Sequence, residues 1–286
     1  METLSSIEAL RRRVAQWRRR GERIALVPTM GNLHQGHLSL VGAAQQAAER
    51  VVVSIFVNPM QFGQNEDFST YPRTIEEDTG KLSDFSVDLV FVPELGDIYP
   101  HPMAQAARVV VPGLSDILCG ASRPGHFTGV ATVVSILFHL VQPDTAVFGE
   151  KDYQQLLIIR RLAADLHMPV TVLGAPTVRE PDGLAMSSRN RYLTPAERAA
   201  APALYDSLRR ARDMINDGDR DYGAVEARAR QWLEAAGFAV DYVTVRRAAD
   251  LREPEGADTE LVILAAGVLG RARLIDNLAL SLKERG

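Results

Sequence analysis

This 286-residue chain contains one cysteine, Cys119, and no apolar run long enough to cross a membrane. A lone cysteine excludes an internal disulfide, and it also excludes a zinc site built from paired cysteines. The chain therefore fits a reducing compartment. Its longest apolar runs, such as Leu261–Leu269, reach about half of the ~20 residues that a membrane-spanning helix needs. The first residues also lack the apolar stretch of a signal peptide. We therefore expect a cytoplasmic protein without a membrane segment.

The chain also has no excess of basic residues. The chain carries 32 Lys and Arg against 36 Asp and Glu, which gives a formal net charge of -4. Neither part is basic, because 15 basic and 18 acidic residues precede Pro176, and 17 and 18 follow it. This balance argues against a nucleic-acid partner. With 46% hydrophobic and 24% charged residues, the composition is that of a soluble globular protein.

An arginine-rich segment covers residues 11–23. Apolar side chains recur through this region at helical spacing, at Ile7, Leu10, Val14 and Trp17. The spacing favours an amphipathic helix with a solvated basic face over a transit peptide or a phosphate-binding patch.

Short apolar runs alternate with helix-like stretches from Arg23 to Leu173. The runs are Ile24–Val27, Val51–Val57, Asp88–Val92, Val109–Val111, Thr145–Phe148 and Val170–Leu173. Since parallel strands need crossover connections, this alternation predicts an α/β, Rossmann-like parallel sheet with helices on both faces over residues 1–176. Ligands of such sheets bind beyond the carboxyl ends of the strands.

The pattern changes after Pro176. Thr194-Pro195-Ala196-Glu197 combines an N-cap, a proline at the first helical position and a capping-box glutamate. We expect helices at 195–214 and 222–236, then strands at Val240–Val245, Leu261–Leu264 and Arg271–Ile275. Residues 177–286 are thus expected to form a smaller C-terminal α+β domain. The acidic stretch 213–221 does not match a calcium loop and is interpreted as a solvated turn.

The first candidate site follows the first expected strand, where residues 28–37 are PTMGNLHQGH. Gly31 and Gly36 allow a ligand to approach the backbone, and the N-terminus of a helix beginning near Leu38 favours anions. His34 and His37 lie three residues apart and can donate hydrogen bonds to one polyphosphate as charge moves onto the leaving group. The pair favours phosphate or adenylyl chemistry over a simple polar turn.

A second candidate site is Gly149–Gln155, between an apolar strand and an apolar helix. Only three of the 32 basic residues are lysines, and Lys151 is one of them. In so arginine-biased a chain, a lysine at this point indicates a compact ammonium that contacts phosphate. Asp152 and Gln155 equally fit a capping box, so the spacing alone leaves a simple helix start open.

Six segments together resemble the pantoate–β-alanine ligase (pantothenate synthetase) family of the HxGH nucleotidyltransferase superfamily. They are VPTMGNLHQGHLSL (27–40), NPMQFG (58–63), YPRT (71–74), RPGHFTGV (123–130), FGEKDYQQL (148–156) and MSSRN (186–190). The resemblance implies ATP-dependent ligation of (R)-pantoate and β-alanine to pantothenate through a pantoyl adenylate, with release of AMP and pyrophosphate. It also implies a homodimer and Mg²⁺ carried largely by ATP, since no acidic metal cluster is visible in the sequence.

The resemblance assigns roles to individual residues. His37, His34, Lys151 and Arg189 would be catalytic. ATP would be bound by Met30, Gly31, Asn32, Leu33, His34, Gln35, Gly36, His37, Gly149, Glu150, Lys151, Asp152, Val178, Met186, Ser187, Ser188 and Arg189. The pantoate/β-alanine site would contain Gln61 and Gln155, with Met30 and apolar residues of 130–134 against the pantoate methyl groups, while Arg123 and His126 would order a loop.

Two departures and two alternatives qualify this interpretation. Gln35 stands where the family often has an acidic residue, and Ala185 stands where the related KMSKS loop has lysine, so Lys151 and Arg189 must carry more of the phosphate charge. Without the resemblance, residues 186–189 would be interpreted as a solvated turn. Another nucleotidyltransferase, or a nucleotide-sensing protein without activity, remains an alternative.

Residues 191–286 lack distinctive motifs and are expected to form a lid over the nucleotide.

Overall fold

The computed structural model describes residues 1–63, 66 and 68–282. By internal contacts the chain divides into two units, which are described separately. The first unit comprises Met1–Glu150 and Gln155–Pro176, and the second comprises Lys151–Gln154 and Thr177–Gly286. No helix in the described part of the chain combines the length and apolar character that crossing a membrane requires.

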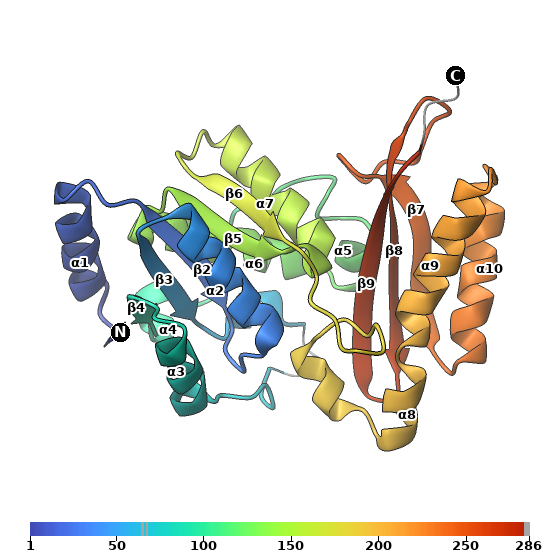
Figure 1. Ribbon diagram of the computed structural model, residues 1–286. Coiled ribbons are helices and arrows are strands. Elements are labelled where there is room, and N and C mark those ends of the chain that lie inside the picture. Colours follow the sequence, from blue (N-terminus) through green and yellow to red (C-terminus); the bar gives the residue numbers. More distant parts are fainter. Residues whose placement is uncertain (64–65, 67, 283–286) are drawn as a thin grey trace. The chain divides into compact units, whose positions relative to one another are not determined.

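A six-stranded sheet forms the centre of the first unit (Figure 1). Its strands are β1 (Glu2–Leu4), β2 (Ile24–Thr29), β3 (Arg50–Ile55), β4 (Leu89–Phe91), β5 (Thr145–Gly149) and β6 (Thr171–Ala175). Their order is β1-β4-β3-β2-β5-β6, and every neighbouring pair is parallel. The expected parallel sheet is confirmed. From β2 the chain continues to β3 and β4 on one side of the sheet, whereas from β5 it continues to β6 on the other side. The order of the strands therefore reverses between β2 and β5, and ligands of open parallel sheets bind at such a reversal.

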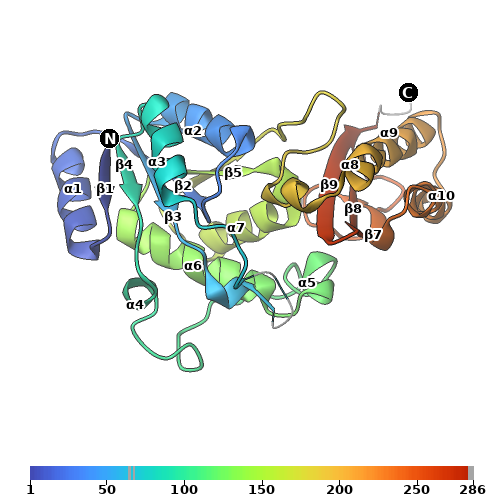
Figure 2. The ribbon, with the colours of Figure 1, turned by 90° about the horizontal axis from the view of Figure 1, so that it is seen from below.

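Helices cover both faces of this sheet. They are α1 (Ile7–Arg19), α2 (Gln35–Ala47), α3 (Ile75–Asp84), α4 (Leu95–Ile98), α5 (Cys119–Ser122), α6 (His126–Val141) and α7 (Tyr153–Asp165). Figure 2 shows α2 and α3 on one face and α6 on the other, and α1 contacts α6. Residues Ile24–Val27 of β2 are fully buried, as expected for a parallel strand packed on both sides.

The arginine-rich segment forms the predicted amphipathic helix. Ser6 caps α1 by accepting a hydrogen bond from the Ala9 nitrogen, and the buried face consists of Leu10, Val14 and Trp17. Arginine side chains lie outside this face, and several of them form ion pairs with nearby carboxylates. Burial of the apolar stripe therefore accounts for the helix.

Two sequence-based expectations in this unit were wrong. Val109–Val111 is not a strand: the Val109 nitrogen donates to the Thr132 hydroxyl on α6 at 2.9 Å, and β1 and β6 are the edge strands of the sheet. The sheet instead gains β1, which pairs with β4 and was not expected. A three-residue run of valines has strand propensity, but propensity alone makes no strand where the backbone bonds to a helix side chain instead of a neighbouring strand.

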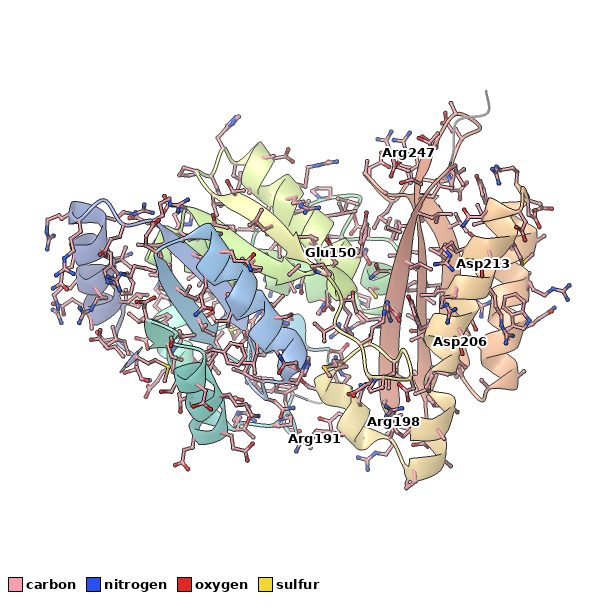
Figure 3. The ribbon with its side chains drawn as sticks, viewed as in Figure 1. Glu150, Arg191, Arg198, Asp206, Asp213 and Arg247 are labelled. Atoms are coloured by element: carbon pink, nitrogen blue, oxygen red, sulfur yellow. The ribbon has the colours of Figure 1, made fainter. Side chains whose placement is uncertain are left out.

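The second unit packs helices on an antiparallel sheet. Strands β7 (Ala239–Arg247), β8 (Glu260–Leu269) and β9 (Ala272–Ser281) pair in sequence order, and α9 (Ala203–Asn216) and α10 (Tyr222–Ala235) contact them (Figure 1). On α9 the residues Leu204, Leu208, Ala211 and Ile215 face the core, while Asp206 and Asp213 point outward (Figure 3).

The predicted helix start at Thr194 is confirmed. Thr194 accepts from the Glu197 nitrogen, and Glu197 accepts from the Thr194 nitrogen at 2.8 Å. The single helix expected over 195–214 is wrong, because α8 (Pro195–Ala200) ends before Pro202 and α9 begins after it. Pro202 has no N–H group to continue the helical hydrogen bonding, so the chain turns there.

Candidate active site

The loop after β2 enters α2 through two left-handed residues, Gly31 at φ 79° and Asn32 at φ 52°. A Cβ on Gly31 would lie 3.0 Å from the Asp78 Oδ2 and 3.1 Å from the Ile55 Cγ2. Glycine is therefore required here both by its dihedral angle and by the lack of space.

Two residues of α3 hold this loop. Asp78 is fully buried, and its carboxylate accepts from the Asn32 nitrogen at 2.8 Å and from the Leu33 nitrogen at 2.7 Å. Lys81 donates from Nζ to the Leu33 carbonyl at 2.9 Å. Sequence analysis missed both residues, because their partners lie more than forty positions away along the chain. The loop is thus fixed by a charged acceptor and a charged donor from one helix.

The two histidines of the HxGH motif form a capping box at the start of α2. His34 Nδ1 accepts from the Gly36 nitrogen at 3.1 Å, and His37 Nδ1 accepts from the His34 nitrogen at 3.3 Å. Their ring centroids are 4.1 Å apart. Because a backbone N–H can only donate, each neutral ring carries its proton on Nε2. Both histidines therefore keep an N–H donor on the side of the ring away from the backbone.

Gln61 ends a short 3₁₀ turn, η1 (Pro59–Gln61), just after β3. The Asn58 Nδ2 donates to the Gln61 Oε1 at 2.9 Å, and the buried Tyr99 hydroxyl donates to the Asn58 Oδ1 at 2.8 Å. The Met60 nitrogen also donates to this Oδ1, which fixes the orientation of the Asn58 amide. Gln61 consequently directs its Nε2 donor toward the Met30 sulfur, 3.2 Å away.

Gly129 on α6 lets η1 pack against that helix. A Cβ at this position would lie 2.5 Å from the Met60 carbonyl carbon and 2.6 Å from the Gln61 nitrogen. The Gly129 carbonyl also accepts from the Asn58 Nδ2 at 3.1 Å. Any larger residue would thus displace the turn that carries Gln61.

Arg123 and His126 link the following loop to Gln61. Arg123 pairs with Glu66 through Nε and a terminal nitrogen, each at 2.6 Å, and His126 Nδ1 donates to the Gln61 carbonyl at 2.8 Å. Burial alone would raise the pKa of Glu66, but the hydrogen bonds and charge of Arg123 outweigh it and hold this pKa below its ordinary value. The loop carboxylate is therefore ionised at neutral pH and held by Arg123.

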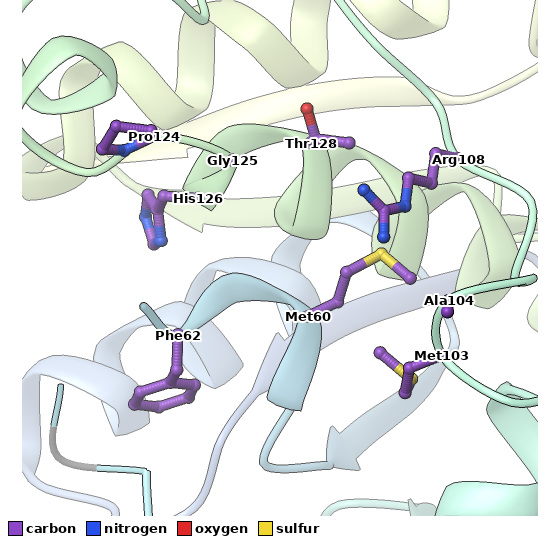
Figure 4. A pocket seen from close by; sticks show the side chains of 9 residues that line it. All are labelled: Met60, Phe62, Met103, Ala104, Arg108, Pro124, Gly125, His126 and Thr128. Carbon is purple, nitrogen blue, oxygen red and sulfur yellow. The ribbon is translucent and has the colours of Figure 1, made fainter. Parts of the chain in front are cut away.

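His126 also lines a cavity of about 330 Å³ between η1, the start of α6 and the 103–108 loop (Figure 4). The side chains of Met60, Met103 and Arg108 line it. None of the residues expected to bind ATP or pantoate lines this cavity.

The remaining expected residues of the first unit follow β5. Gly149 ends the strand, Glu150 begins a 3₁₀ turn, η2 (Glu150–Asp152), and Gln155 lies in the first turn of α7. Since β2 has β3 and β5 as direct neighbours, the segments after these three strands emerge at one edge of the sheet. The structure thus brings Met30–His37, Gln61 and Gly149–Glu150 to the same edge.

The other expected residues belong to the second unit. Val178 and Met186 are adjacent across a hairpin, where the Met186 nitrogen donates to the Val178 carbonyl at 2.9 Å. Ser187 then caps η3 (Ser188–Tyr192) by accepting from the Arg189 nitrogen at 3.2 Å. The segment is an ordered, half-buried helix start and not a fully solvated turn. Within residues 1–63, 66 and 68–282, no three His, Cys, Asp or Glu side chains are grouped to hold a metal ion.

Comparisons with known proteins agree with this arrangement. Residues 2–279 match the family model described as pantoate-beta-alanine ligase. The chain is 57% identical over 284 residues to the pantothenate synthetase of Nitrosococcus oceani, with 99% of both chains covered. It is 56% identical over 286 residues to that of Thioalkalivibrio sulfidiphilus, with 100% of both covered.

Solved structures are similar over the whole chain. The pantothenate synthetase of Thermus thermophilus matches with a TM-score of 0.91 and 46% identity, covering 97% of this chain and 99% of that one. The pantoate-beta-alanine ligase of Francisella tularensis, complexed with beta-gamma ATP and β-alanine, matches with a TM-score of 0.82 and 33% identity, covering 100% and 99%. On sequence and structure together, the chain belongs to the pantoate–β-alanine ligase family.

Proposed function

We propose that this protein joins (R)-pantoate to β-alanine at the expense of ATP, giving pantothenate, AMP and pyrophosphate. The family match over residues 2–279 supports the reaction. The observation that carries the site is the histidine capping box, which keeps two Nε2 donors at the strand edge that also bears Gln61. Donors fixed before the reaction can stabilise charge that develops on phosphate oxygens.

In the first half-reaction, a carboxylate oxygen of pantoate attacks the α-phosphorus of ATP. An O–P bond forms, the bond to the bridging oxygen of the β-phosphate breaks, and pyrophosphate leaves. His34 and His37 would donate to the phosphates as charge accumulates on the leaving group. Lys151 would lie between the pantoate carboxylate and the α-phosphate and reduce their mutual repulsion. Catalysis here is mainly positioning and charge stabilisation.

In the second half-reaction, the amine of β-alanine attacks the acyl carbon of pantoyl adenylate. A C–N bond forms, the C–O bond to AMP breaks, and the amine loses a proton to solvent. The nucleophile must be the neutral amine, so this step requires deprotonation of an ammonium group before attack.

Pantoate recognition would rest on two glutamines. Gln61 presents an N–H donor because Asn58 occupies its Oε1, and a donor suits the hydroxyl or carboxylate oxygens of pantoate. Gln155 would bind the same substrate from α7, and the Met30 side chain with apolar residues of 130–134 would contact the pantoate methyl groups. Gln61→Ala should therefore raise the pantoate KM and leave the ATP KM unchanged.

The residues that we assign to ATP come from several segments of the chain. From the first unit we assign the segments Met30–His37 and Gly149–Glu150 to the nucleotide. From the second we assign Lys151, Asp152, Val178 and Met186–Arg189, with Arg189 and the two serines on the triphosphate. The C-terminal part of the chain would act as a lid, and Mg²⁺ would be carried by ATP and water. Deletion of residues 191–286 that left turnover unchanged would reject the lid assignment.

The deciding experiment measures AMP release from MgATP with pantoate and β-alanine together and with each omitted. Pyrophosphate exchange with pantoate alone accompanies it. AMP formation that requires both substrates, with pantoate-dependent exchange, supports the ligase. A stable dinucleotide-like product would identify a different nucleotidyltransferase, and the absence of both signals would remove the substrate assignment.

We also propose a cytoplasmic homodimer. The single cysteine supports a reducing compartment. Two apolar side chains between α4 and α5 are exposed, Val110 by 56% and Ile117 by 36%. A second copy of the chain would cover such side chains. Light scattering should give a dimer mass, and Val110→Asp should shift it toward the monomer. A monomer at micromolar concentration would contradict the assignment.

A further inference from the structure

The segment Lys151–Gln154 covers the end of η2 and the first two residues of α7, and two of its residues bond to the C-terminal sheet or the residue next to it. The Asn277 Nδ2 donates to the Lys151 carbonyl at 2.9 Å. The Tyr153 hydroxyl donates to the Ala248 carbonyl, also at 2.9 Å. Asn277 lies on β9 and Ala248 directly after β7, so two parts of the same sheet hold the backbone that carries Lys151.

Asn277 is itself fixed by its neighbours. It is 8% exposed, and its backbone nitrogen donates to the Asp276 Oδ1 at 2.8 Å. Asp276 is 3% exposed and pairs with both terminal nitrogens of Arg179, at 2.6 and 3.0 Å. The Arg179 guanidinium lies 3.5 Å from the centroid of the Tyr205 ring. A bidentate pair between a buried carboxylate and a stacked guanidinium restricts the movement of Asp276 and of the adjacent Asn277 on β9.

The same pair holds the hairpin that leads to Met186. The backbones of Arg179 and Ala185 form an isolated antiparallel β-bridge. A terminal nitrogen of the Arg179 guanidinium also donates to the Gly183 carbonyl at 3.1 Å. Adjacent residues of one strand therefore anchor two segments that the proposed function places on ATP: Asp276 anchors the hairpin, and Asn277 anchors Lys151.

The hydrogen bond to the Lys151 carbonyl requires an amide side chain at position 277. The Lys151 carbonyl can only accept, so its partner must donate, and an aspartate of the same shape would present two acceptors instead. Asn277 thus holds the backbone of Lys151 through its carbonyl, and the side chain of Lys151 extends from that fixed point.

We propose that Asn277 is a positioning residue for Lys151. By holding the Lys151 carbonyl, Asn277 would restrict where the ammonium can reach, so that less ordering is needed when ATP and pantoate bind. This inference rests on the proposed function, in which Lys151 acts on the pantoate carboxylate and the α-phosphate.

The test is a double-mutant cycle on pantoate-dependent pyrophosphate exchange with the full chain. Asn277→Ala should lower kcat about three- to tenfold, the effect of losing one hydrogen bond. Asn277→Asp, which keeps the volume, should lower it at least as much. In the Lys151→Ala background, Asn277→Ala should change kcat less than twofold, because its effect passes through the lysine. A residue that only stabilises the fold would give additive losses.

Thr244→Ala is the matched control. Thr244 is buried on β7 of the same sheet, and its hydroxyl donates to Glu226 at 3.0 Å, away from every residue assigned to substrate. Its loss should lower the thermal midpoint and leave kcat within twofold of wild type.

Three outcomes would overturn the inference. If Asn277→Ala keeps wild-type kcat while Lys151→Ala is impaired, only the positioning role of Asn277 fails. If the two losses are additive, Asn277 does not act through the lysine. If Lys151→Ala itself keeps wild-type exchange, the proposed role of Lys151 fails first, and the inference fails with it.

Discussion

Replacement of Asp78 tests whether α3 fixes the loop between β2 and α2. The Asp78 carboxylate is fully buried, and it accepts from the backbone nitrogens of Asn32 and Leu33 and from the Thr74 hydroxyl. Asp78→Ala leaves both backbone donors without their acceptor. Asp78→Asn keeps one oxygen but turns an NH₂ group toward one of the two donors.

The magnitude follows from the number of bonds lost. A hydrogen bond to a charged group contributes about 1.5–3 kcal/mol, so the two bonds from backbone nitrogens, taken without the Thr74 bond, give roughly 3–6 kcal/mol for Asp78→Ala and about half of that for Asp78→Asn. Because the loop continues directly into the histidine capping box, the same changes should also lower pantoate-dependent pyrophosphate exchange at temperatures where the variant is folded.

The assay is urea unfolding, with the free energy extrapolated to water and compared with wild type. Glu76→Gln on the same helix is the control, since Glu76 is exposed and its loss should change the free energy of unfolding by less than about 0.5 kcal/mol. The reasoning is refuted if Asp78→Asn is as stable as the control and has unchanged exchange activity.

Three further predictions follow from the site. His37→Ala should lower exchange about 10²–10³-fold, the effect of losing one preorganised donor, and wild-type turnover would contradict its role. Gly129→Ala places a Cβ 2.6 Å from the Gln61 nitrogen and should raise the pantoate KM but not the ATP KM; equal changes in both would argue for general misfolding. Arg123 keeps the pKa of Glu66 below 4.5, so their pairing stabilises the fold fully above that pH and progressively less below it. The thermal midpoint difference between wild type and Glu66→Gln should thus be constant from about pH 7 to about pH 5 and shrink toward about pH 3; a constant difference throughout would contradict the pairing.

The sequence was sufficient to predict the features that depend on local pattern. β-branched runs predicted the central strands, and the Thr194–Glu197 capping box predicted a helix start that is present. The HxGH spacing placed His34 and His37 at the N-terminus of a helix, because that arrangement uses only neighbouring residues.

Features that depend on distant residues were not predictable in this way. Asp78 lies in an ordinary charged helix, and only the folded chain shows that its carboxylate holds a loop 45 residues away. Tyr99 bonds to Asn58 and Asn277 bonds to Lys151, both far away along the chain, and nothing in their local sequence indicates these partners. The expected strand at Val109–Val111 was wrong for the opposite reason: its residues have strand propensity, but Val109 is hydrogen-bonded to Thr132 on α6 and not to a strand.

The hydrogen bond from Asn277 to the Lys151 carbonyl also bears on how the chain can be divided for protein engineering. A fragment ending at Pro176 would retain all six strands of the parallel sheet, yet it would lack the groups that hold Lys151 and Tyr153. Chimeras that exchange C-terminal halves between relatives should therefore exchange residues 151–154 together with them. Otherwise the lysine comes from one parent and its anchor from the other.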